Sequence, residues 1–144
     1  TLEAIARPVA SLHEGFIVSL IDARRGEVYA AVFEVKEREM KLVVPAATYR
    51  PEGLKGLVSS LTPNRRRVVV GNGVRAHASL SEWEDDSVNV LAAAWDSPSP
   101  YSIAMMGQIR LAKHGPDDLV TLEPNYIRPS DAEISWIARN APSA

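Results

Sequence analysis

The pattern of apolar and polar residues predicts two strands in the first quarter of the chain, at residues 16–21 and 28–35. Both runs are rich in β-branched and aromatic residues and have the length of strands. The first run is apolar at neighbouring as well as alternate positions, which predicts a strand covered on both faces. Between the runs lies the polar corner 22–27, where Gly26 can adopt a positive φ at low cost, so we expect a hairpin loop at residues 23–26. This hairpin is predicted to lie in the middle of a sheet.

A third apolar run at residues 40–49 follows the charged turn 36–39. Pro45 has no amide hydrogen to donate to a ladder, so this run is predicted to be an edge strand. Three consecutive strands joined by short polar turns make an antiparallel meander.

The remaining elements alternate between helix and strand. The helices are marked by helical spacing of apolar residues, by proline at a first turn and by closing Gly-Pro or Thr-Pro-Asn segments. The strands are marked by short apolar runs. The pattern predicts helices at 1–12, 51–61, 74–83 and 100–114, and strands at 68–70 and 88–94. Ile103, Met106 and Ile109, or alternatively Ala104, Gly107 and Leu111, are expected to form the apolar face of the last of these helices. Residues 119–144 show little periodicity beyond a short run at 133–139.

Composition narrows the class of protein. A chain of 144 residues, 46% hydrophobic and 24% charged, is typical of one globular domain. The net charge of −2 predicts no strong overall attraction to nucleic acid, but it does not exclude a local basic patch. The chain has no cysteine, which excludes disulfides and thiolate chemistry. No run reaches the roughly 18 apolar residues of a membrane helix, and the first residues lack the pattern of a signal peptide.

Four segments carry a family resemblance. Residues 21–29, Ile-Asp-Ala-Arg-Arg-Gly-Glu-Val-Tyr, resemble the IDAR-x-GEVY signature of the TsaB (YeaZ) family, in the glycoprotease-like branch of the actin/sugar-kinase superfamily. Residues 1–6 are similar to the segment that joins the two lobes in that family, residues 68–73 to its VxxGxG strand and turn, and residues 123–129 to its closing P-x-Y-x-R motif. The resemblance assigns structural roles to Gly26, Tyr29, Gly71, Gly73, Pro124, Tyr126 and Arg128.

The resemblance implies a fold and a domain organisation. The order of strands and helices matches the ribonuclease-H-like lobe of the actin-type (ASKHA) fold, an α/β lobe with a mixed five-stranded sheet and helices packed on it. Residues 1–130 correspond to the C-terminal lobe, with an inter-lobe helix at 1–13, and residues 131–144 form a tail with no counterpart. The N-terminal lobe of family members, which opens with a phosphate-loop motif, has no match here.

The resemblance also implies a function. Family members are cytoplasmic, non-catalytic scaffold or activator subunits in the formation of threonylcarbamoyladenosine (t6A) on tRNA. They act through TsaD, which transfers the threonylcarbamoyl group, and they engage TsaE, a P-loop ATPase. ATP and metal are therefore expected on partner subunits, with no cofactor on this chain. The alternatives are a glycoprotease-like metallopeptidase homologue, and a lobe without activity that self-associates, for instance as a homodimer, through apolar surface near residues 1–12.

The charged corner of the hairpin is the main candidate site. Asp22, Arg24, Arg25 and Glu27 could face a protein partner, a nucleotide or tRNA. The interpretation that we favour is a solvated loop with weak ion pairs, worth about 0–1 kcal/mol each. Asp22 follows a buried strand and is expected to accept hydrogen bonds from loop amides rather than to act as a base.

The other polar motifs favour structural interpretations. Residues 71–73, Gly-Asn-Gly, could hold a phosphate, but a tight turn is favoured because two glycines are a weak signal. The three arginines at 65–67 could contact RNA phosphate, and a solvated loop before a buried strand is favoured. The acidic residues at 82–86 are likewise interpreted as a solvated loop. Tyr126 and Arg128 are expected to hold the tail against the domain. No catalytic motif is recognisable, and the spacing of the three histidines, His13, His77 and His114, predicts no metal site.

Overall fold

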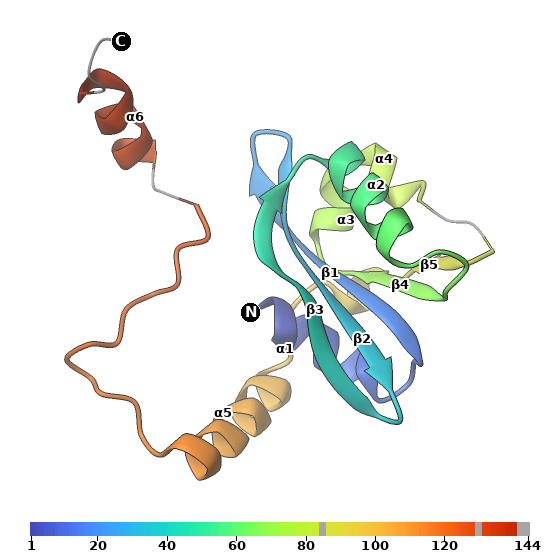
Figure 1. The fold of residues 1–144 in the computed structure, drawn as a ribbon, viewed down its shortest axis with the longest axis horizontal. Coiled ribbons are helices and arrows are strands. Elements are labelled where there is room, and N and C mark those ends of the chain that lie inside the picture. Colours follow the sequence, from blue (N-terminus) through green and yellow to red (C-terminus); the bar gives the residue numbers. More distant parts are fainter. Residues whose placement is uncertain (84–85, 129–130, 141–144) are drawn as a thin grey trace.

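The computed structural model describes residues 1–83, 86–128 and 131–140. Its centre is a mixed sheet of five strands in the order β3-β2-β1-β4-β5, with helices on both faces (Figure 1). The predicted α/β fold and the order of strands and helices are confirmed. The elements are α1 (Leu2–Ala10), β1 (Gly15–Arg24), β2 (Glu27–Lys36), β3 (Glu39–Tyr49), α2 (Pro51–Leu61), β4 (Arg67–Val70), α3 (Gly73–Ala76), α4 (Ala78–Ser81), β5 (Val88–Val90), the 3₁₀-helix η1 (Ala93–Trp95), α5 (Pro100–His114) and α6 (Asp131–Asn140).

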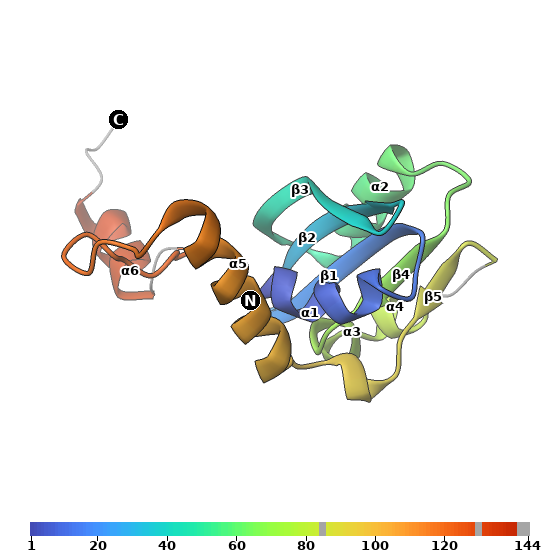
Figure 2. The same ribbon diagram turned by 90° about the horizontal axis from the view of Figure 1, so that it is seen from below.

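Strand β1 is the centre of the sheet, as its continuous apolar pattern predicts. It pairs antiparallel with β2 and parallel with β4, and every residue from Gly15 to Leu20 is buried. On one face it packs against side chains from α2, α3 and α4, and on the other against α1 (Figure 2). The buried Ser19 hydroxyl donates a hydrogen bond of 2.9 Å to the carbonyl of Leu2, which attaches the start of α1 to β1.

The two hairpins of the meander have turns of the same kind. The pairing of β1 with β2 continues to Arg24 and Glu27, so the turn consists of Arg25 and Gly26 alone, with φ of 53° and 79°. The predicted four-residue loop was therefore too long, because the strands pair through a bulge between Asp22 and Arg24. The second turn, Glu37-Arg38, also has two positive φ values, 53° and 64°. Positive φ at both central positions is characteristic of type I′ hairpin turns.

Two predictions about the second half of the chain were wrong. The helix expected at residues 74–83 is split into α3 and α4 at His77, which has an extended backbone with φ −136° and ψ 119°. The strand expected at residues 88–94 ends at Val90. Its partner β4 leaves the sheet at Gly71, so no ladder is available for residues beyond Leu91.

Helix α5 forms where it was predicted, but its apolar side chains are not covered. Only Ser102 of the helix is buried, whereas Tyr101 is 73% and Leu111 57% exposed. No residue of either expected apolar face is buried, because α5 contacts the rest of the molecule mainly along α1. After Gly115 the chain runs without regular structure to Arg128, and α6 lies apart from the sheet (Figure 1). Residues 84–85 of the predicted acidic loop, 129–130 and 141–144 lie outside the described residues.

His13, in the link between α1 and β1, carries a buried polar atom without a hydrogen-bond partner in the described chain, its Nε2. Burial and the neighbouring Arg66 charge lower the pKa of His13 below its ordinary value of 6.5. The folded state thus binds a proton less readily than the unfolded state. The neutral His13 therefore contributes to the free energy of unfolding above about pH 6.5, and this contribution is lost as the pH falls below that value.

We therefore expect the free energy of unfolding to decrease on acidification below about pH 6.5, by at most about 1.4 kcal/mol per pH unit from one histidine. His13→Gln removes the titrating group and should flatten this part of the profile. Urea unfolding followed by circular dichroism between pH 5 and pH 8 measures both slopes. Identical slopes for the two proteins would contradict the role given to His13.

Candidate functional site

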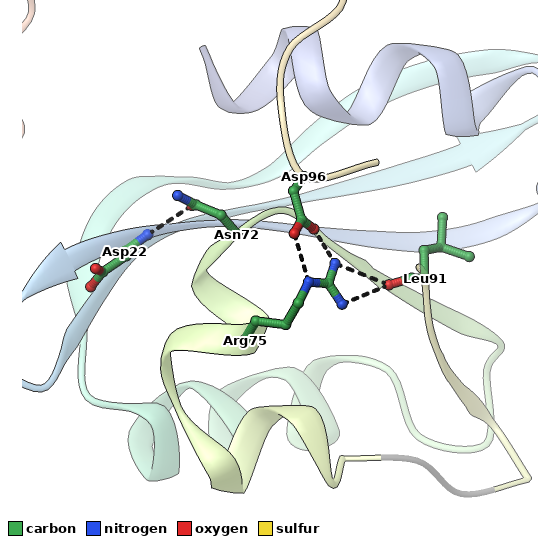
Figure 3. Close-up of polar contacts among 5 residues, drawn as sticks. All are labelled: Asp22, Asn72, Arg75, Leu91 and Asp96. Atoms are coloured by element: carbon green, nitrogen blue, oxygen red, sulfur yellow. Dashed lines mark hydrogen bonds and ion pairs between the residues drawn. The ribbon is translucent and has the colours of Figure 1, made fainter. Parts of the chain in front are cut away.

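The candidate site lies where the parallel strands β1, β4 and β5 end. The carboxyl ends of parallel strands share one edge of the sheet, and open α/β sheets bind ligands at that edge. Here the edge is formed by Asp22, Asn72, Arg75, Leu91 and Asp96, which we call the carboxyl edge (Figure 3).

Asp22 is fixed by hydrogen bonds on both sides. Its amide donates to Asn72 Oδ1 over 3.1 Å (Figure 3). Its Oδ1 accepts from the Arg24 amide over 2.8 Å. The second bond is the predicted bond to a loop amide. An ion pair of 3.6 Å joins Asp22 to the Arg24 guanidinium, which is 86% exposed. The arrangement holds the end of β1 against the turn that follows β4.

That turn depends on glycine for steric reasons. Gly71 has a φ of 109°, and a Cβ at this position would collide with the carbonyl oxygen of Leu20. A Cβ at Gly73 would lie 3.0 Å from the Leu20 Cβ and from the Ile21 carbonyl carbon. The Gly-Asn-Gly sequence therefore lets the turn approach β1 closely enough for Asn72 to reach Asp22, whether or not a ligand binds.

A second polar group ties α3 to the loop after β5. Arg75 Nε donates to Asp96 Oδ2 over 2.6 Å, and Arg75 Nη2 pairs with Asp96 Oδ1 (Figure 3). Both terminal nitrogens also lie 3.3 Å from the Leu91 carbonyl oxygen. The hydrogen bonds to Asp96 raise the pKa of Arg75 above its ordinary value. Sequence reasoning missed this pair, because 21 residues separate its members and neither belongs to a motif.

The remaining charged residues of the hairpin corner separate in space. Arg24 and Arg25 are exposed at the tip, whereas Glu27 is paired with Arg128 over 3.2 Å, across 101 residues of sequence. The ring of His77 lies 3.3 Å from the Glu27 carbonyl oxygen. Of the predicted polar cluster, Asp22 and Arg24 therefore stay together at the end of β1, while Arg25 lies in the turn and Glu27 pairs with the tail through Arg128.

The other residues of the closing motif differ in exposure. Tyr126 is 77% exposed, and Pro124 is also exposed. Asn125 and Ile127 instead line a hollow of about 520 Å³ that also contains the half-buried Tyr29. The tail thus meets the sheet through residues 125, 127 and 128 rather than through its tyrosine.

Within residues 1–83, 86–128 and 131–140, no three His, Asp or Glu side chains come close enough to one another to hold a metal ion. No helix of the described chain has the length and apolar character needed to cross a membrane.

Comparison with solved structures defines the class of fold. The structure of YeaZ from Pseudomonas aeruginosa superimposes with a TM-score of 0.66 at 19% identity, over 87% of this chain and 55% of YeaZ. A second structure, of a protein with similarity to peptidase YeaZ from Pseudomonas aeruginosa, gives a TM-score of 0.65 at 17% identity, over 88% of this chain and 56% of its own. The chain therefore has the α/β fold of the YeaZ structures, with a mixed five-stranded sheet.

No family model matches the chain, but comparison by sequence finds a relative. The tRNA threonylcarbamoyladenosine biosynthesis protein TsaB of Bacillus subtilis (strain 168) is 29% identical over 126 residues, which is 86% of this chain and 52% of TsaB. The resemblance to the TsaB (YeaZ) family is thereby confirmed. The chain spans about half the length of the relatives that it matches.

Gly71→Ala is expected to destabilise the protein by at least about 2 kcal/mol, because φ is positive and the new methyl group meets the β1 backbone. Gly53→Ala is the matched control. Gly53 lies inside α2, and a Cβ added there would have no neighbouring atom within 4 Å, so alanine should stabilise the protein by about 0.5–1 kcal/mol. Thermal or urea unfolding measures both. Equal effects of the two substitutions would contradict the close contact between the turn and β1.

Proposed function

We propose that this chain is a lobe of a TsaB-like scaffold protein that takes part in t6A modification of tRNA. The observation that carries the proposal is the match to Bacillus subtilis TsaB over 86% of the chain. The signature at residues 21–29 also forms the centre of the fold, since it joins β1 to β2. The proposal places the protein in the cytoplasm.

The polar contacts of the carboxyl edge support a non-catalytic role. Asp22 accepts a hydrogen bond from a loop amide, and Arg75 is paired with Asp96 and Leu91. The Asp22–Asn72 bond holds β1 to the turn after β4, and the Arg75–Asp96 pair holds α3 to the loop after β5. In this proposal the catalysis, with its ATP and metal, takes place on TsaD-like and TsaE-like partners.

The surface of α5 supports dependence on a partner. The apolar side chains that lie exposed on α5 include Tyr101, Ile103, Ile109 and Leu111, and Leu12, which follows α1, is 76% exposed. Soluble monomers rarely expose a contiguous apolar surface of more than a few hundred Å², and larger ones mark interaction sites. A scaffold lobe would have such a surface because its role is to bind other proteins.

We expect the gene product that carries this sequence to co-elute with the TsaD homologue of the same organism on a sizing column. Its peak should move to the mass of the complex at micromolar concentrations. A gene product that elutes separately from TsaD under these conditions would remove the basis for the scaffold role. An unrelated P-loop ATPase in place of TsaD serves as the control for non-specific association.

Self-association is a second candidate, favoured by the exposed apolar side chains of α5 and not by α1, whose apolar residues are buried. If α5 pairs between copies, the molar mass of the 144-residue chain should rise with concentration in light scattering. Ile109→Lys, on α5, should then restore the monomer, because it places a charge on the apolar surface. Leu119→Lys is the control, since Leu119 is 84% exposed outside α5. A monomer mass for the unmodified chain at every concentration rejects this candidate.

A further inference from the structure

A polar hollow of about 540 Å³ lies at the tip of the β1–β2 hairpin, where three segments meet. The first is the turn itself, the second is the junction between β3 and α2, and the third is the link between α3 and α4. His77 holds the third segment to the first, through its contact with the Glu27 carbonyl oxygen. The lining of the hollow includes Arg25, Arg50, Glu52, His77 and Ser79.

Basic groups outnumber acidic groups around this hollow. Arg25 and Arg50 are exposed and His77 is half-buried, while Glu52 alone is acidic among the described residues of the lining. Lys55 adds a cation next to the hollow, where its Nζ donates to the Ser79 carbonyl over 3.1 Å. A guanidinium has five donors in a planar fork, so one arginine can contact a phosphate and keep a contact within the protein.

The turn does not require an arginine. Arg25 is the first central residue of a two-residue turn in which both φ values are positive, and asparagine followed by glycine suits such a turn best. A non-glycine residue in this conformation is held at a cost of about 1 kcal/mol or more. The Glu37-Arg38 turn has the same conformation, so positive φ alone does not mark a site. The two turns differ in their surroundings, because Arg38 is not among the residues that line the hollow.

From this arrangement we propose that the hairpin tip binds the phosphate backbone of RNA through Arg25 and Arg50, with His77 beside them. The inference rests on the proposed function, in which the substrate is a tRNA, and it assigns this lobe a direct contact with that substrate. The polar lining favours a nucleic-acid backbone over a protein partner, because the core of a protein interface is depleted of charge. Because the chain as a whole carries a net charge of −2, we expect its electrostatic attraction to RNA to come from this local patch.

The test uses the 144-residue chain and a fluorescently labelled RNA stem-loop, with binding followed by anisotropy at salt concentrations from about 50 to about 200 mM. Arg25→Asn creates an Asn-Gly turn, so the fold should be kept or stabilised while one phosphate contact is lost. Arg50→Gln removes the second contact. Each substitution should raise the Kd about three- to tenfold and lower the salt slope by about 1. Arg38→Asn, the same exchange in the other turn, should change neither quantity.

Several outcomes would overturn the inference. One is the absence of RNA binding by the unmodified chain at about 50 mM salt. Another is a Kd that Arg25→Asn and Arg50→Gln leave unchanged, or that Arg38→Asn raises equally. If Arg25→Asn abolishes co-elution of the gene product with TsaD and leaves RNA binding intact, the hollow is a protein interface. If the gene product co-elutes with TsaD but the chain does not bind RNA, the RNA-binding inference is wrong and the scaffold role stands. If the chain binds RNA but the gene product does not co-elute with TsaD, the scaffold role is wrong and the RNA-binding inference stands.

Discussion

The burial of β1 between two layers of side chains is the constraint on which the rest of the structure depends. Ile17, Val18 and Leu20 are fully buried, and each contributes about 1.5–3 kcal/mol by leaving water. The same strand provides the pairing edges for β2 and β4, so it determines both the antiparallel and the parallel half of the sheet. The carboxyl edge, the hairpin tip and the attachment of α1 all depend on where this strand begins and ends.

Local patterns were sufficient to predict the elements that organise the fold. The apolar runs of β1 and β2 and the proline at the first turn of α2 depend only on neighbours in sequence, and these elements were predicted well. The break at His77 coincides instead with a contact to the Glu27 carbonyl oxygen, 50 residues away, and the periodicity of residues 74–83 carries no information about that contact. Likewise, the periodicity of α5 predicts a helix but does not indicate what covers its apolar side chains.

The candidate site was predicted in part, for the same reason. The bond from Asp22 to a loop amide is local and could be inferred from the residue types around the strand end. The contacts of Asn72 with Asp22 and of Arg75 with Asp96 join segments that meet only because β1, β4 and β5 run parallel. The polar contacts at this edge connect elements, while exposed apolar side chains lie along α5. This division is consistent with a protein that positions partners.

The most direct test of the central claim, participation in t6A formation, is the t6A content of total tRNA after depletion of the gene that encodes this chain. Mass spectrometry of digested tRNA measures t6A against unmodified adenosine, with a second, unrelated tRNA modification as the internal reference. The account predicts that t6A falls while the reference modification is unchanged, and that re-expression of the gene restores it. An unchanged t6A content after depletion would contradict the account.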